Sequence, residues 1–133
     1  MGGELVVQIQ ADADVLLARQ KGRELAKSLR FSGSELTLIA TAISEVARNI
    51  VTYAKRGQIA LRLVSQGRRR GIRVVAQDAG PGIVDIARAM EDGFSTSSSL
   101  GLGLPGSRRL MDEFDIVSAL GKGTTVTMTK WER

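Results

Sequence analysis

The stretch Ser32-Gly-Ser-Glu-Leu-Thr-Leu-Ile-Ala-Thr-Ala-Ile-Ser-Glu-Val-Ala-Arg-Asn-Ile50 decides the fold more than any other part of the chain. Ser32 and Glu35 have the spacing of a capping box, in which each side chain accepts a hydrogen bond from a backbone amide at the helix start. Apolar side chains then recur at steps of three and four: Leu36, Ile39, Ile43, Val46 and Ile50. This period predicts an amphipathic helix with one face in a core, and Gly57 is its expected stop.

The segments on either side of this helix predict a strand, a second helix and a hairpin. Residues 5–10 read as a strand, after which Asp12 or Asp14 can cap a helix that continues to about Leu29. Strands at residues 58–64 and 72–77, separated by a glycine-flanked turn at 67–71, form the expected hairpin. Its tip carries three solvated arginines, Arg68, Arg69 and Arg70.

The last third of the chain predicts two helices and two strands. A short helix at residues 84–91 precedes a loop at 94–103, and a further helix runs from 105 to about 113. Two strands, at residues 114–119 and 124–130, flank the turn that follows. The whole order predicts an α+β fold, a two-layer sandwich whose mixed, largely antiparallel sheet is covered by helices on one face. The length of 133 residues suits a single domain over residues 1–133.

Composition excludes several classes of chemistry. The chain has no cysteine, which excludes a disulfide framework, a thiolate metal site and a cysteine nucleophile. Its start has neither a basic leader nor a long apolar run, so we expect a cytoplasmic protein without a membrane segment. The net charge of +5 favours acidic partners, nucleic acid included, but equally fits ordinary solubility. No aromatic residue stands among the three arginines to stack bases, which disfavours nucleic acid.

Glu45 and Asn49 are four residues apart and therefore neighbours on one helical face. They lie off the apolar stripe and can border a cleft. A side-chain amide oxygen together with nucleotide phosphates can hold a magnesium ion, a task that Asn49 fits. A carboxylate one turn away can accept the proton of an attacking hydroxyl, which Glu45 fits. Taken alone, the pair also suits a plain solvated helix face.

Asp78 ends the apolar strand and begins the motif Asp78-x-Gly80-x-Gly82. A carboxylate there can accept a hydrogen bond from an exocyclic amine such as that of adenine. The two glycines let the backbone turn sharply and approach a flat ring. A simple turn after a strand is the alternative reading of this motif.

The loop Gly101-Leu-Gly-Leu-Pro-Gly106 matches G-x-G-x-x-G, but its late position does not fit a dinucleotide-binding unit. Its glycines free backbone amides, and the helix that follows offers its positive N-terminus to phosphate. The loop therefore suits a polyphosphate, or serves only as a hinge before the helix. The small polar residues 94–99 ahead of it suit a cover over bound nucleotide or an ordinary surface loop.

These motifs, with Gly123-Thr124-Thr125, stand in the order of the N, G1, G2 and G3 boxes of the GHKL (Bergerat) ATP-binding superfamily, which the chain resembles. Across nearly its whole length it resembles the small bacterial serine kinases that include anti-sigma factors, and above all the RsbT-type switch kinases of the stressosome. The stretches at residues 42–50, 77–83, 101–106, 109–114 and 130–133 carry this resemblance.

The resemblance implies a role for each motif residue. Glu45 would be the catalytic base, Asn49 the magnesium ligand and Asp78 the adenine contact. The remaining pocket residues would be Gly80, Gly82, Gly101, Gly103, Gly106 and Thr125. Two positions depart from the family pattern: Arg48 replaces a small hydroxyl residue, and no arginine directly precedes Gly101. Lys55 and Arg108 are the candidates for stabilising the transferred phosphoryl group.

Histidine is absent, so the chain cannot phosphorylate itself on histidine. The resemblance implies ATP and Mg²⁺ as cofactors, and a hydroxyl acceptor on a STAS-domain protein of the RsbS or RsbR kind. It also implies that the protein binds an RsbU-like serine phosphatase, which it activates when released. Two alternatives stay open: a non-catalytic ATP-binding module or anti-sigma factor that sequesters its partner, and a nucleic-acid binder with steep salt dependence.

Overall fold

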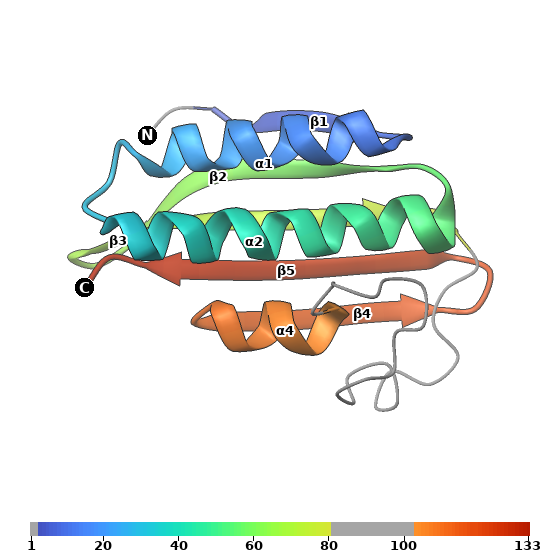
Figure 1. The fold of residues 1–133 in the computed structure, drawn as a ribbon. Helices are drawn as coiled ribbons and strands as arrows, with labels where there is room; N and C mark the ends of the chain where they lie inside the picture. Colours follow the sequence, from blue (N-terminus) through green and yellow to red (C-terminus); the bar gives the residue numbers. More distant parts are fainter. Residues whose placement is uncertain (1–2, 81–102) are drawn as a thin grey trace.

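The computed structural model describes residues 3–80 and 103–133, which form a helical layer over an antiparallel sheet (Figure 1). The sheet has the order β1-β2-β3-β5-β4, and each neighbouring pair is antiparallel. Its strands are β1 (Leu5–Ile9), β2 (Gly57–Gln66), β3 (Arg69–Asp78), β4 (Glu113–Ala119) and β5 (Gly123–Trp131). The α+β prediction is confirmed, with the difference that no parallel pairing occurs among the described strands.

The helices lie together on one face of the sheet (Figure 1). They are α1 (Asp12–Ala26), α2 (Gly33–Asn49), the π-helical turn η1 (Ile50–Ala54) and α4 (Gly103–Leu110). α2 packs against α1 and against α4, and therefore lies at the centre of the layer. No helix within these two described segments has the length and apolar character needed to cross a membrane.

The core lies between the helices and the sheet because one face of each element is aliphatic. Its fully buried members come from β1, α2, β2, β3 and β5: Ile9, Ile39, Ile43, Ile59, Leu61, Ile72, Val74 and Met128. The cross-strand register aligns these positions, since Leu61 pairs with Val74 and Val74 with Met128. Residues paired directly across antiparallel strands point to the same face, so alternate residues of each strand reach the core.

The capping box of α2 is confirmed. Ser32 Oγ accepts from the Glu35 backbone amide at 3.1 Å, and Glu35 Oε1 accepts from the Ser32 amide at 2.9 Å. Gly57, however, does not stop the helix. The helix widens into η1 and ends at Lys55, whose φ is +74°, and Gly57 is the first residue of β2.

The boundaries of α1 and α4 also differ from the sequence prediction. α1 has Ala11 at its N-cap, because Asp14 reaches back to accept from the Gln10 and Ala11 amides, and the helix ends at Ala26 rather than near Leu29. α4 spans Gly103–Leu110, earlier at both ends than expected. The predicted helix at 84–91 lies outside the described residues.

The hairpin turn is shorter than predicted, so two of its three arginines belong to β3. The chain turns at Gly67, whose φ is +61°, and Arg69 already pairs with Gln66. The Arg70 guanidinium forms an ion pair with Glu132 at 2.9 Å. Glu132 also accepts from the backbone amide of Arg30, in the connection between α1 and α2. This carboxylate therefore fastens the end of the chain to both layers.

Candidate nucleotide site

Glu45 is a buried carboxylate in the last turns of α2. Its exposed fraction is only 6%. Most of the other buried residues of α2 are apolar. Arg48, one turn further on, donates to Glu45 Oε2 at 2.8 Å, while its own side chain stays 45% exposed. Burial of a carboxylate costs free energy unless it is paired, and the guanidinium supplies that partner. Arg48 therefore fixes the orientation of Glu45.

The helix surface beside Glu45 is polar and fixed by hydrogen bonds. Ser44 is buried and donates to the Ala40 carbonyl at 3.0 Å, and its hydroxyl accepts from Arg19 of α1 at 3.1 Å. This contact joins α1 to the part of α2 that carries the carboxylate.

Asn49 is the last residue of α2, directly before η1. It is half-buried, and its side-chain amide forms no hydrogen bond within the described part of the chain. Single π-helical turns are rare and occur mostly at functional sites. Here the turn carries the chain from Asn49 to Ala54, which packs against the glycine that follows β3. The helix end and the strand end are thereby brought together.

Asp78 lies at that strand end, and three glycines surround it. Its Oδ1 accepts from the Gly80 amide at 2.9 Å, which holds the turn. A side-chain carbon built at Gly80 would lie 2.6 Å from Ala54 Cβ, and one at Gly123 would overlap the Asp78 carbonyl oxygen. One at Gly57 would overlap the Gln77 carbonyl oxygen. These glycines let β2, β5 and η1 approach Asp78 closely, as expected for Gly80 from the sequence.

The register of β5 places the neighbouring residues Thr124 and Thr125 on opposite faces of the sheet. Thr124 pairs with Asp78, so both side chains lie on the helix-covered face, and Thr124 is buried. Thr125 pairs with Gln77 on the opposite face, so the structure does not bring the predicted pocket residue Thr125 beside Asp78. The Thr124 hydroxyl lies 2.9 Å from the Ser118 hydroxyl of β4. Sequence reasoning missed Thr124, because strand register was not known.

The glycine-rich segment leads into α4, whose first turn carries Gly103 and Gly106. The helix packs against α2, and Ser107 is fully buried. The ends of α2 and β3 and the starts of β2 and β5 lie at the right-hand end of the layers in Figure 1, whereas α4 begins nearer the middle. Gly82, Gly101 and the predicted cover at 94–99 lie outside the described residues.

The donor set at this end suits a metal ion carried by a nucleotide rather than a closed protein cage. Within residues 3–80 and 103–133 no three Asp or Glu side chains converge to hold a metal. Magnesium commonly takes one or two protein oxygens and completes its shell with phosphates and water. The available amide oxygen of Asn49 fits that pattern.

These features match a known class of ATP-binding protein. Residues 10–130 match the family model of the histidine kinase-like ATPase domain, and the chain belongs to this family. Over all 133 residues, and over the full length of both proteins, the chain is 49% identical to the serine/threonine-protein kinase RsbT of Bacillus subtilis (strain 168).

Anti-sigma F factors are more distant relatives. The protein of Thermoanaerobacter sp. (strain X514) is 36% identical over 103 residues, covering 73% of this chain and 71% of its own. That of Oceanobacillus iheyensis is 32% identical over 103 residues, covering 72% of this chain and 69% of its own. The resemblance to GHKL proteins and to RsbT-type kinases, stated from the motifs, is confirmed.

Proposed function

We propose that this protein is an ATP-dependent serine/threonine kinase that phosphorylates STAS-domain antagonists and acts as a partner switch in cytoplasmic stress signalling. On release it would activate a serine phosphatase. The observation that carries the proposal is the buried Glu45 held by Arg48, one turn before Asn49 and at the end of the layers that holds Asp78. The full-length identity to a serine/threonine-protein kinase supports it.

Asp78 would recognise the adenine ring by accepting a hydrogen bond from its exocyclic amine. One carboxylate oxygen already holds the Gly80 amide, which leaves the other for the ligand. The register favours Thr124 over Thr125 as the hydroxyl that supports this contact, since Thr124 is paired with Asp78 on the same face. Gly80, Gly82, Gly101, Gly103 and Gly106 would give the nucleotide close access to the backbone.

Asn49 would hold magnesium through its amide oxygen, together with the phosphates. When bound, the ion neutralises phosphate charge and fixes the γ-phosphoryl group. Backbone amides at the start of α4 would contact the phosphates. Lys55, which directly follows η1, and Arg108, in the last turn of α4, would be the candidates for stabilising the transferred group.

Glu45 would accept the proton of the acceptor hydroxyl as its oxygen attacks the γ-phosphorus and the bond to the β-phosphate oxygen breaks. ADP leaves and the acceptor becomes a phosphoester. Arg48 would keep the carboxylate oriented until the substrate hydroxyl arrives. A non-catalytic module that sequesters a sigma factor remains the second candidate, favoured by the anti-sigma F factor relatives.

The test is transfer of label from γ-labelled ATP with magnesium to a STAS-domain protein, comparing the wild type with Glu45→Gln. Loss of the base is expected to lower the transfer rate by about 10²- to 10⁴-fold. The matched control is Glu24→Gln, an exposed position on α1, which should transfer at the wild-type rate.

ATP binding measured on the same variants separates the two candidates. Retained ATP affinity with lost transfer in Glu45→Gln supports the kinase. Wild-type protein that binds ATP tightly and transfers no label would contradict it and favour the sequestering module.

A further inference from the structure

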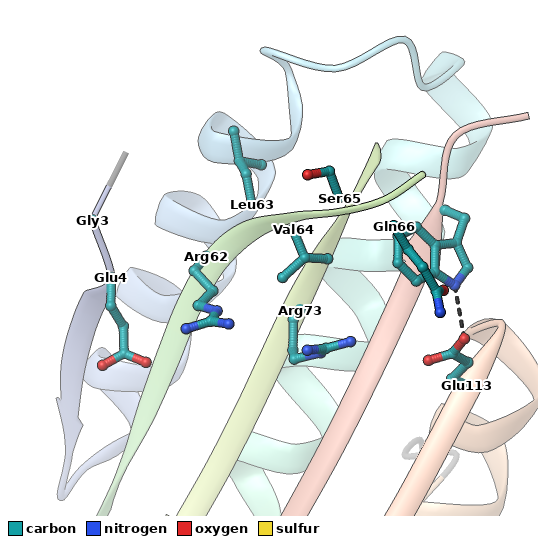
Figure 2. Close-up of a pocket in the computed structure, with 10 residues that line it drawn as sticks. Gly3, Glu4, Arg62, Leu63, Val64, Ser65, Gln66, Arg73 and Glu113 are labelled. Atoms are coloured by element: carbon teal, nitrogen blue, oxygen red, sulfur yellow. Dashed lines mark hydrogen bonds between the residues drawn. The ribbon is translucent and has the colours of Figure 1, made fainter. Parts of the chain in front are cut away.

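The sheet face opposite the helices carries a groove unrelated to the nucleotide site (Figure 2). It has a volume of about 620 Å³ and is lined by β2, β3, β5 and the residues just before β1 and at the start of β4. Arg62 of β2 and Arg73 of β3 lie in it side by side, with Glu4 on one side and Glu113 on the other. The face therefore has a distinct pattern of charge.

The two arginines are direct cross-strand partners. Arg62 pairs with Arg73, which places their Cβ atoms about 5 Å apart on the same face. Like charges at such positions repel each other and destabilise the sheet. Neither guanidinium forms an ion pair with any residue in segments 3–80 and 103–133. An anion bound between them would remove this repulsion.

The floor of the groove is fixed by contacts that hold Arg73 and the neighbouring Trp131. Arg73 Nε donates to Thr129 Oγ1 at 3.1 Å, which leaves its two terminal nitrogens for a ligand. The Trp131 indole donates to Glu113 at 2.9 Å, and the Arg69 guanidinium lies 4.4 Å from its ring centroid. Gly71 makes room for the ring, since a side-chain carbon there would lie 2.9 Å from Trp131 Cε3.

The surrounding residues select the kind of anion. Glu4 and Glu113 flank the arginine pair and would repel a continuous string of phosphates, as in nucleic acid. Val64 and the indole of Trp131 also line the groove, although both side chains are almost fully buried. A carboxylate at the centre and uncharged or basic groups beside it match this pattern. The net charge of +5 also favours encounter with an acidic partner.

We propose that the groove on the open sheet face docks an acidic segment of a partner protein, with an Asp or Glu side chain bridging Arg62 and Arg73. Planar guanidinium groups bind carboxylates through paired, charge-assisted hydrogen bonds, which makes arginine better suited than lysine to this role. The surface is independent of phosphoryl transfer, because it lies on the other side of the sheet from Glu45 and Asp78.

The chain offers a reporter for this test, because Trp131 is its only tryptophan. The probe is a capped pentapeptide with a single central glutamate between uncharged residues, titrated at physiological salt and followed by Trp131 fluorescence and backbone and indole NMR signals. We expect saturable changes confined to β2, β3 and β5 on the open face. The same peptide with glutamine in place of glutamate should bind at least about tenfold more weakly.

The decisive variant is Arg62→Gln/Arg73→Gln, which should weaken peptide binding by about tenfold or more. The matched control, Lys21→Gln/Lys27→Gln, removes the same charge from an exposed position of α1 and from the exposed residue directly after it, and should keep the wild-type affinity. Because the substitution relieves repulsion, the urea midpoint of the arginine variant should not fall. The single Arg62→Gln variant provides a milder check on folding and binding.

Several outcomes would overturn the proposal. They are equal weakening in both double variants, NMR changes centred on the helices, tighter binding of inorganic phosphate or a single-stranded oligonucleotide than of the peptide, and concentration-dependent self-association through the same face. Wild-type affinity for the glutamine peptide would do the same, because it would show that the carboxylate is not recognised.

Discussion

The two faces of the sheet use charge in opposite ways. On the helix-covered face, the carboxylate of Glu45 is buried and satisfied by an arginine one turn away. On the open face, the exposed Arg62 and the partly buried Arg73 have no carboxylate partner among the described residues. A buried carboxylate that is held by an arginine suits catalysis, which needs a side chain in a fixed orientation. An exposed pair of like charges is suited to recognition of a ligand from outside.

The faces also differ in how they depend on the backbone. The helix-covered end relies on glycines that permit close approach around Asp78, whereas the open face relies on which residues are opposed across strands. Substitutions of the glycines around Asp78 should therefore disturb the fold and nucleotide binding together. Substitutions on the open face should alter binding of the acidic peptide and leave the stability of the fold nearly unchanged.

The largest expected difference is between two glycines of the same turn. Gly123→Ala combines a φ of +95° with overlap on the Asp78 carbonyl, and should cost about 3 kcal/mol of unfolding free energy. Gly121→Ala has a φ of +74° but no neighbouring atom within 4 Å, and should cost about 1 kcal/mol. Urea unfolding measures both, and equal losses would show that close packing around Asp78 is not needed.

A smaller effect is expected at the carboxylate that fastens the two layers together. The Arg70 guanidinium, and next the Arg30 amide, hold the pKa of Glu132 below its usual value of 4.5. The folded protein therefore releases this proton more readily than the unfolded chain. The resulting stabilisation is present above the usual value and is lost as pH falls through the lowered one.

Urea midpoints of the wild type and Glu132→Gln, measured from about pH 6 to about pH 3, check this expectation. The variant should be less stable at the upper end of the range, and the difference should shrink towards the lower end. Glu24→Gln, at an exposed position, serves as the control. A constant difference over the whole range would contradict the role of the carboxylate charge.

Features that depend on neighbouring residues in sequence were predictable. The Ser32–Glu35 capping box depends on two residues three positions apart, and the apolar period of α2 depends only on the residues of that helix. The position of Glu45 off the apolar stripe also followed from helical spacing. The resemblance of the ordered motifs to the GHKL superfamily identified the ATPase family, which no single motif established.

Features that depend on tertiary pairing were not predictable. Thr125 was expected in the pocket, but the β3–β5 register puts Thr124 beside Asp78, and a shift of one residue reverses the face. The prediction that Gly57 ends the helix was wrong, because the π-helical turn η1 ends before this residue. Gly57 is instead the first residue of β2. The Arg62–Arg73 pair was overlooked for the same reason, since only the hairpin register reveals it.

The most direct test of the account is ATP affinity, measured by calorimetry for Asp78→Asn and Asp115→Asn. An asparagine at 78 can keep the Gly80 hydrogen bond through its amide oxygen, but would turn an NH₂ donor towards the adenine amine. ATP binding should therefore weaken by about tenfold or more. Asp115, exposed on β4, should tolerate the change without loss of affinity. Unchanged affinity in Asp78→Asn, or equal loss in both variants, would contradict a nucleotide site where α2, β3 and β5 meet.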